Sequence, residues 1–381
     1  MAVANQAMVL LLPLYALELS GSVAFAALVV GLRGFGVLLF DVPAGLLVRR
    51  FGDKWVLFGG LATIAVSMLA LSVATSQWAL ALLVMPLGAA HAAWFLGWLS
   101  YITDTCAPDE RGRATSAVAG IQRFGSFAGP LAGGVIAQGV GYPTAFLVGS
   151  VIAALAAALS FLFTDNVHPA KPAKPAETSH LKTIGRIFVA NKKTFSTAGA
   201  VALIFQFMRA VRQLLIPLFG VVVGLDAATI GLIYSLSAAV DMSLFYPVGI
   251  AMDRWGRKWT GMPSIVFFVL GLILLPFAQG FYTLLGAGLI LGFANGLSVG
   301  LVQIIGMDLS PPDARGEFLG VWRLISDAGW AGGPLLAGIL VDVVSLSAAS
   351  FAVAGLGVVG GLMFFFLVPE TLHIARDQAP P

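Results

Sequence analysis

Cysteine and histidine are nearly absent from this sequence. Its 381 residues include one cysteine, Cys106, and four histidines. A single cysteine excludes an internal disulfide, and no cysteine and histidine residues have the spacing of a metal site. We therefore predict neither a structural metal nor a cofactor.

Charged residues are also scarce. Lys, Arg, Asp and Glu make up 10% of the chain, whereas hydrophobic residues make up 59%. A soluble domain carries about 25% charged residues, so this chain has too few to coat a water-facing surface. The net charge of +3 does not indicate nucleic-acid binding, because the basic residues follow a membrane topology instead.

Long apolar runs dominate the sequence instead. Runs of about 20 residues recur along the whole length, and each can cross a bilayer as a helix. Only helices and closed barrels satisfy the backbone inside lipid, and runs this long exclude the alternating pattern of a barrel. We expect an all-α membrane protein with twelve spans near 1–20, 24–48, 56–75, 78–103, 113–139, 143–164, 196–220, 226–252, 259–279, 281–307, 317–341 and 348–369.

The basic residues of the predicted loops fall on one side only. They follow spans 2, 4, 8 and 10 and fill the connection between spans 6 and 7, while the opposite loops contain no Lys or Arg. By the positive-inside rule, both termini are cytoplasmic. We expect a multi-pass protein of the plasma (inner) membrane, with Cys106 in a cytoplasmic loop.

The sequence repeats itself at an offset of 204 residues. Proline, glycine, tryptophan and aspartate align without a gap, as in Pro43 with Pro247, Gly45 with Gly249, Trp55 with Trp259, Asp104 with Asp308, and Gly129 with Gly333. An even number of spans separates the copies, so both have the same orientation, as in parallel transporter repeats. The repeat favours two rocking halves over the fixed pore of a channel.

The repeat divides the chain into domains. We predict an N-terminal six-helix bundle at 1–164, a cytoplasmic linker at 165–193, a C-terminal six-helix bundle at 194–369 and a cytoplasmic tail at 370–381. The linker is rich in proline and lysine, and an apolar face beside Lys182 and Arg186 predicts a short interfacial helix within it.

A charged motif follows span 8. It reads G-x-x-x-D-R-x-G-R-K, formed by Gly249, Asp253, Arg254, Gly256, Arg257 and Lys258. In this motif the chain resembles the major facilitator superfamily, most closely its drug:proton antiporter branch, and the resemblance covers nearly the whole chain. It implies a central site between two six-helix bundles that expose it alternately to each side.

The first-half copy of this motif departs from the pattern. Arg49 stands where aspartate is expected, and Asp53 stands where arginine is expected. The exchanged charges are four residues apart, a spacing at which they can still pair. Acid and base at helix ends can lock one conformation and release it in another, and Asp104 and Asp308 are candidate partners. The alternative is plain topological anchoring by basic residues.

Span 5 carries a second signature of that branch. The pattern G-x-x-x-G-P-x-x-G-G is present as Gly125, Gly129, Pro130, Gly133 and Gly134. Small residues at this spacing permit close helix contact, and proline bends a helix; ordinary membrane-helix packing is the alternative. The branch also has a basic residue in span 4 linked to proton movement, which this chain lacks.

Charges predicted inside the bilayer are costly and therefore candidates for function. They are Arg33, Asp41, Arg123, Arg209, Arg212, Asp241, Arg323 and Asp327, with His91 as a proton-carrier candidate. The excess of arginine suggests a substrate with anionic character or a site poised to release protons. At about 1.5 Å per residue, Arg209 and Asp241 lie at similar depths and can pair.

The resemblance implies which spans meet. Spans 1, 4, 7 and 10 would line the central cavity, so the residues that would face substrate are His91, Trp94, Trp98, Gln206, Arg209, Arg212, Asn295 and Gln303. Spans 2 and 11, and spans 5 and 8, would meet across the halves. This predicts pairs of Asp41 with Arg323 and of Arg123 with Asp241, and structural ion pairs that never meet substrate are the alternative.

Together these features predict a secondary active transporter for a small molecule, and proton-coupled efflux of a drug or metabolite is our first hypothesis. An uptake permease for a sugar or organic anion is the alternative. A membrane-embedded enzyme or receptor would need a cluster of catalytic or ligand groups that the sequence does not show. No G-x-x-x-x-G-K-[ST] loop is present, so ATP-driven transport would need another subunit. We expect the partners to be substrate, protons and lipid, with no nucleic acid, and the monomer to be functional.

Overall fold

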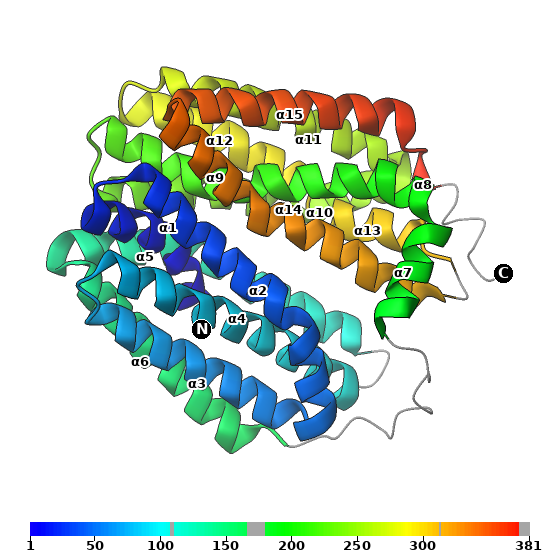
Figure 1. The fold of residues 1–381 in the computed structure, drawn as a ribbon, viewed down its shortest axis with the longest axis horizontal. Coiled ribbons are helices and arrows are strands. Elements are labelled where there is room, and N and C mark those ends of the chain that lie inside the picture. The colour runs from blue at the N-terminus through cyan, green and yellow to red at the C-terminus, as the bar shows by residue number, and fades with distance from the viewer. Residues whose placement is uncertain (107–109, 166–179, 312–313, 373–381) are drawn as a thin grey trace. The chain divides into compact units, whose positions relative to one another are not determined.

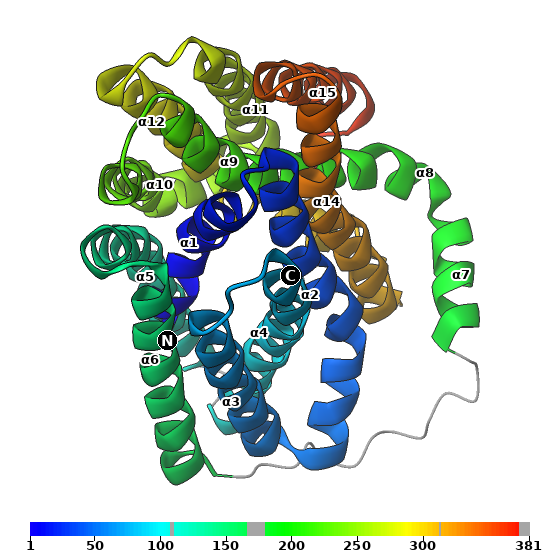
Figure 2. The same ribbon diagram turned by 60° about the vertical axis from the view of Figure 1, so that its left-hand side comes forward.

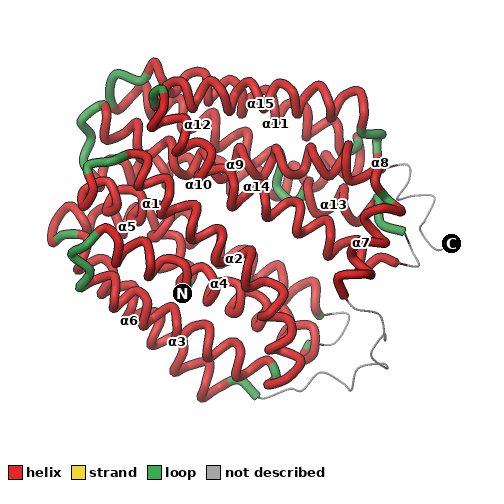
Figure 3. The backbone as a smooth tube through the Cα atoms, viewed as in Figure 1, coloured by secondary structure: helices red, strands yellow, loops and turns green. Residues whose placement is uncertain are grey.

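The computed structural model describes residues 1–106, 110–165, 180–311 and 314–372, and within these ranges it is helical and contains no strand (Figures 1 and 3). Because a helix bonds its own backbone groups, this is a viable way to cross lipid. The expected all-α fold class is confirmed.

The first half folds into six long helices. They are α1 (Ala2–Ser20), α2 (Val23–Phe51), α3 (Asp53–Ser72), α4 (Gln77–Thr105), α5 (Arg111–Val140) and α6 (Tyr142–Phe163). Within this half α4 packs along both α2 and α3, which contact each other little, and α1 packs along α5 (Figure 2).

The second half repeats this order with more interruptions. It contains α7 (His180–Ala190), the short α8 (Lys192–Thr194), a π-helical turn (Phe195–Gly199), α9 (Ala200–Val222), α10 (Ala227–Trp255), α11 (Arg257–Leu274), a 3-10 turn (Leu275–Phe277), α12 (Phe281–Leu297), α13 (Leu301–Asp308), α14 (Arg315–Val343) and α15 (Leu346–Leu367). Here α11 packs against both α12 and α15 (Figure 2). Helix α7 lies where the interfacial helix was predicted; the linker residues 166–179 and the tail residues 373–381 lie outside the described part.

One predicted span is divided into two α-helices. The run at 281–307 is broken between α12 and α13, where Gly300 has a φ of +73°. Side chains other than glycine rarely adopt this left-handed conformation. The helix therefore stops at Leu297 and restarts at Leu301.

Eleven stretches of the described chain are long and apolar enough to cross a membrane. The remaining long helix, α5, has 30 residues but is rich in glycine and also carries Arg123 and Gln138, so its hydropathy is lower. Length and composition are the criteria of this assignment. Large apolar side chains such as Leu82 and Phe163 are 73% and 78% exposed, as lipid-facing positions require.

The described residues form two compact units by their contacts. Unit 1 comprises Met1–Ala173 with Gly220–Ser235, and unit 2 comprises Lys174–Phe219 with Leu236–Pro381. The end of α9 and the start of α10 thus belong to unit 1, whereas most of both helices belongs to unit 2.

The 204-residue repeat is visible in how helices touch inside each unit. A Cβ on Gly88 of α4 would lie 2.1 Å from the Arg33 carbonyl oxygen of α2. At the equivalent place in unit 2, a Cβ on Gly292 would lie 2.3 Å from the carbonyl oxygen of Ser237. Both halves therefore bring span 2 and span 4 of their bundle together through a glycine that admits no side chain.

Candidate substrate site and loop ion network

The break after α12 creates a polar site inside unit 2. The Arg209 guanidinium of α9 donates to the Ser298 carbonyl oxygen at 2.5 Å and to the Ser298 hydroxyl at 2.8 Å. Because the helix ends at Leu297, the Ser298 carbonyl accepts from the Leu301 N–H at 3.2 Å, three residues on, in place of a regular helical bond, and it can also accept from Arg209. The same guanidinium donates to Gln206 one turn earlier, at 3.1 Å.

A carboxylate belongs to the same site. The side-chain amide of Asn295 on α12 donates to the Asp241 carboxylate of α10 at 2.8 Å. Asn295 and Ser298 are three residues apart, so they lie on neighbouring turns of one helix face. At the end of α12, Ser298 thus binds an arginine and Asn295 binds an aspartate. All five side chains are intermediate or fully buried in unit 2.

Arg212 lies deeper than Arg209. It is 5% exposed and donates to the Ser237 hydroxyl at 2.9 Å, which in turn donates to the Gly288 carbonyl at 2.6 Å. These two consecutive hydrogen bonds connect α9, α10 and α12. Of the two arginines predicted to meet substrate, Arg209 is therefore the more accessible.

Unit 1 places its interior arginine differently. Arg33 of α2 donates to the Asn5 side chain of α1 at 2.9 Å. In the repeat, Asn5 is equivalent to Arg209, and Arg33 is equivalent to Ser237. The interior arginine is therefore on the second span of the first half and on the first span of the second half.

The aromatic candidates of α4 pack within unit 1. Trp94 and Trp98 lie against the apolar cluster of Leu57, Leu61 and Ala157. The His91 ring lies 5.4 Å from the Trp94 ring.

Other predicted residues lie apart from this site. Gln303 on α13 is exposed. Arg323 pairs with Asp327 within α14 at 3.2 Å, while Arg123 and Asp41 are half-buried. The pairs predicted across the two halves stay predictions.

The span-5 motif forms close contacts on two sides of α5. A Cβ on Gly125 or Gly129 would come within 2.7 Å and 2.6 Å of backbone atoms of α1, and Gly133 lies against the Ala7 side chain. A Cβ on Gly134 would lie 2.4 Å from the Ala227 carbonyl at the start of α10. The Pro130 carbonyl sits 2.4 Å from where a Cβ of Gly231 would be. Each of these glycines is therefore required for close packing inside unit 1.

The loop motif of the second half builds an ion network. Arg257 donates through Nε to the Asp308 carboxylate at 3.0 Å, and both side chains are less than a tenth exposed. It also contacts Asp253 at 3.3 Å, whose side chain is 75% exposed. The Thr371 hydroxyl donates to Asp308 at 2.7 Å. Asp308 thus connects the loop between α10 and α11 to the segment after α15. Arg254 of the same motif is exposed.

Glu370 completes this network. Its carboxylate accepts from the backbone N–H groups of Arg257 at 2.8 Å, Lys258 at 2.9 Å and Leu372 at 3.1 Å. Burial opposes the charge of Glu370, but these donors and the nearby Arg257 outweigh it and lower the pKa of its carboxyl group. The missing side chain of Gly256 makes room for this carboxylate, because a Cβ there would lie 2.6 Å from it, and the φ of +107° at Gly256 independently favours glycine.

The first-half loop differs in burial. Asp53 is fully buried at the start of α3, whereas Arg49 and Asp104 are exposed. The pairing predicted between Arg49 and Asp53, and the gating roles of these charges, stay predictions.

Comparison with known proteins identifies this arrangement. The family description Major Facilitator Superfamily matches residues 1–245 and 198–380. The chain belongs to this superfamily. Its long apolar helices make it a multi-pass membrane protein, as the sequence predicted.

Solved superfamily structures share the fold over nearly the full length. The nucleoside transporter NupG superimposes with a TM-score of 0.79, at 16% identity, over 96% of both chains. The peptide transporter POT gives 0.78, at 14% identity, over 98% of this chain and 92% of that one. At these identities the likeness concerns the fold alone.

Sequence relatives within the superfamily cover shorter stretches. An MFS-type efflux transporter, pyiT, of Pyricularia grisea is 35% identical over 32% of this chain and 21% of its own length. A probable quinate permease of Aspergillus flavus is 33% identical over 27% and 19%, and Multidrug resistance protein 3 of Bacillus subtilis is 27% identical over 35% and 25%. The matched stretch is thus about a fifth to a quarter of each relative.

Several residues of these sites escaped the sequence reading. Ser298, Ser237 and Asn5 are small polar residues in apolar runs, and only their partners distinguish them from neutral packing. Glu370 and Thr371 had a usable signal, because they follow the last span directly, where a carboxylate can reach the loop after span 8.

Proposed function

We propose that this transporter is a secondary active carrier that exports a small molecule in exchange for protons. The proposal rests on the polar site at the α12 break, where Arg209 and Asp241 are held by Ser298 and Asn295 on adjacent turns. An arginine stays charged at all relevant pH values, whereas a carboxylate can accept a proton. The site therefore offers one permanent charge and one that can change.

Arg209 supplies the substrate specificity in this proposal. Its guanidinium is half-buried and oriented by hydrogen bonds to Gln206 and Ser298. A carboxylate, phosphate or sulfonate that replaced these acceptors could bind the guanidinium with two hydrogen bonds. Protonation of Asp241 would raise the net positive charge of the site and favour an anion there. Release of the proton would favour its departure. His91 of unit 1 is the second candidate for a proton carrier.

The loop network would couple this site to alternating access. Arg257 and Asp308 link the α10–α11 loop to the end of α13, the continuation of the broken span that carries Ser298. A change at the break can therefore be transmitted along the eight residues of α13 to this ion pair. We propose that the pair is made in one conformation and broken in the other.

The exporter assignment is supported by the names of two relatives, an efflux transporter and a multidrug resistance protein. Uptake of an organic anion is the alternative, and the quinate permease match together with Arg209 favours it, since quinate is a carboxylate. We propose the plasma (inner) membrane as the location, with both termini cytoplasmic, and a functional monomer.

Flux in proteoliposomes under an imposed pH gradient tests the coupling. We expect substrate-dependent proton movement with wild-type protein and none with Asp241→Asn, which removes the titratable group but keeps a hydrogen-bonding side chain. Asp342→Asn is the matched control, because Asp342 is an exposed carboxylate at the end of α14.

Three outcomes of this assay matter. Unchanged proton coupling in Asp241→Asn would refute the role of Asp241. Full transport of anions by Arg209→Ala would refute the substrate contact. If substrate accumulates only in the compartment that corresponds to the cytoplasm, the proposed export would be wrong and the protein would be an uptake carrier.

A further inference from the structure

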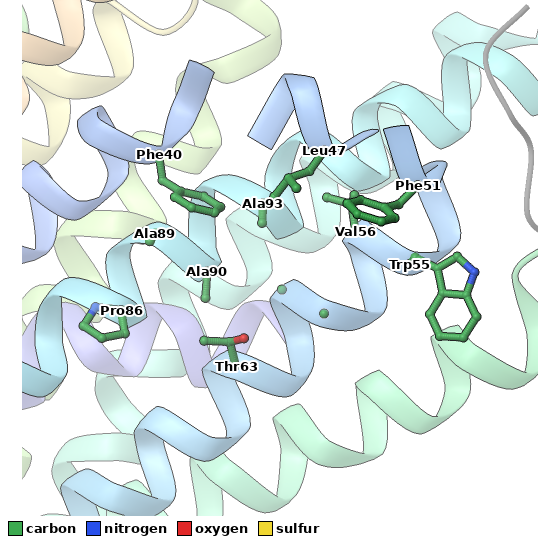
Figure 4. Close-up of a pocket in the computed structure, with 12 residues that line it drawn as sticks. Phe40, Leu47, Phe51, Trp55, Val56, Thr63, Pro86, Ala89, Ala90 and Ala93 are labelled. Atoms are coloured by element: carbon green, nitrogen blue, oxygen red, sulfur yellow. The ribbon is translucent and has the colours of Figure 1, made fainter. Parts of the chain in front are cut away.

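A groove in unit 1 has no part in the site described above. It is a hollow of about 390 Å³ between α2 and α3, and α4 forms its floor (Figure 4). Its walls are apolar, and the residues that line it are Phe40, Leu47, Phe51, Trp55, Val56, Gly59, Gly60, Thr63, Pro86, Ala89, Ala90 and Ala93. We call it the α2–α3 groove.

The groove exists because of how three helices pack. α2 and α3 each follow α4 closely but separate from each other. On α4, Pro86, Ala89, Ala90 and Ala93 present small side chains at helical spacing, so the floor is low. Gly59 on α3 leaves a gap, since a Cβ there would meet nothing within 4 Å.

The length of the groove corresponds to one leaflet of a bilayer. Phe51 and Trp55 lie at the loop end of the groove and Phe40 lies deeper along α2 (Figure 4). At 1.5 Å per residue, Phe40 is about 16 Å from Phe51 along the helix. The hydrocarbon core of a bilayer is about 30 Å thick, so an acyl chain of one leaflet fits the depth of the groove.

The loop end of the groove is positively charged. The Arg50 guanidinium lies 5.3 Å from the centre of the Phe51 ring, which lines the groove. The Lys54 ammonium lies 5.0 Å from the Phe161 ring, which packs against Trp55 at 5.9 Å. Arg50 thus lies next to a ring that lines the groove, and Lys54 is connected to the lining ring of Trp55 through Phe161.

Further positive charge lies near the opening. Arg49 and Arg50 are exposed, whereas the neighbouring Asp53 is fully buried. Tryptophan and basic residues at this level are typical of the membrane interface, where basic residues attract anionic headgroups.

We propose that the α2–α3 groove binds an anionic phospholipid, with an acyl chain in the hollow and the phosphate at Arg50 and Lys54. Binding at this place would hold α2 and α3 on α4 without touching the polar site of unit 2. The proposal is independent of the transported substrate and of its direction.

The repeat supplies an internal comparison. Trp255, Lys258 and Trp259 line a hollow of about 780 Å³ in unit 2, at the positions equivalent to Phe51, Lys54 and Trp55. There the Lys258 ammonium donates to the Phe365 carbonyl at 2.8 Å, and Glu370 places a carboxylate in the wall. This second hollow is therefore a poorer site for an anion, and we expect one tightly held lipid, in unit 1.

Native mass spectrometry of the purified full chain tests the proposal. Dioleoyl-phosphatidylglycerol and dioleoyl-phosphatidylcholine are added separately to protein in detergent, and the bound fraction is titrated. We expect one phosphatidylglycerol to bind more tightly than phosphatidylcholine. Each basic residue near a membrane surface contributes about a fivefold factor to such binding, so Arg50→Gln with Lys54→Gln should weaken it about 25-fold. The exposed pair Lys192→Gln with Lys193→Gln is the control and should leave it unchanged.

Filling the groove provides an independent arm. Gly59→Leu should abolish binding, because Gly59 lines the hollow and a Cβ there would meet nothing within 4 Å, so the new side chain takes up space in the hollow. Gly355→Leu is its matched control, since a Cβ on Gly355 of α15 also meets nothing within 4 Å, and Gly355 lines none of the hollows described above. If Gly59→Leu lowers the Tm, Thr63→Leu fills the deeper part of the groove instead.

The results that would overturn the proposal are distinct from a failure of transport. Equal binding of both lipids, retention of phosphatidylglycerol in the double charge variant, or retention in both filled variants would each refute it. Displacement of the bound lipid by a transported substrate would also refute it and make the groove a substrate entrance.

Discussion

Arg257 contacts two carboxylates at similar distances, and we predict that they contribute very differently to stability. Asp308 lies 3.0 Å away with both side chains less than a tenth exposed, whereas Asp253 lies 3.3 Å away with 75% of its side chain exposed. Removing one partner of a buried pair costs about 3–5 kcal/mol. An exposed pair contributes about 0–1 kcal/mol, because water screens it.

The expected order of unfolding free energies follows from these contacts. Asp308→Asn should lose about 3–5 kcal/mol, since Arg257 loses its buried counter-charge and, among the described contacts, keeps the exposed carboxylate of Asp253 and the Met252 carbonyl at 2.7 Å. Asp253→Asn should lose less than about 1 kcal/mol. Arg257→Met combined with Asp308→Leu should lose much less than the sum of the single changes, because no buried charge is left alone.

Equilibrium unfolding in mixed detergent micelles, followed by tryptophan fluorescence, measures these differences. The full cycle gives the coupling energy between Arg257 and Asp308. Equal losses for Asp308→Asn and Asp253→Asn would refute the reasoning, since burial would then not decide the strength of the pair. A strictly additive double variant would refute it as well.

Two further predictions follow from close packing and from charge. Gly292→Ala should destabilise by about 1–3 kcal/mol in the same unfolding assay, because its Cβ would lie 2.3 Å from the Ser237 carbonyl, while Gly355→Ala should be neutral or stabilising; similar values for both would contradict the packing argument. The pKa of Glu370 is lowered in the folded protein, so its contribution to stability is present above the ordinary carboxyl range near about 4.3 and is lost as the pH falls through the lowered value. The Tm difference between wild type and Glu370→Gln should therefore be largest at neutral pH and become smaller in acid. A Tm difference that grows in acid would contradict the lowered pKa of Glu370.

Some features could be predicted without coordinates because they depend on period and composition. The spans follow from the length of apolar runs, and α2 and α15 begin within two residues of their predicted starts at 24 and 348. The repeat predicted that both halves would use the same contacts, and Gly88 and Gly292 do so at equivalent carbonyls. The superfamily itself followed from the loop motif that contains Arg257.

The candidate site was only partly predictable. Arg209, Asp241 and Asn295 were identified because charge and amide groups are costly in lipid and stand out in an apolar run. Which of them meet depends on helix rotation, and Ser298 as the partner of Arg209 could not be found without knowing that the span breaks there.

By itself, the sequence determined that this chain crosses a membrane in two homologous halves, because hydropathy and repetition are properties of local composition. The tertiary structure decided where charge is buried and which charges meet. Both Asp308 and Asp253 end apolar helices in the sequence, yet the tertiary structure buries Asp308 against Arg257 and leaves Asp253 exposed. The physical reason is that the strength of an ion pair depends on the surrounding dielectric, which is set by packing between helices distant in the chain.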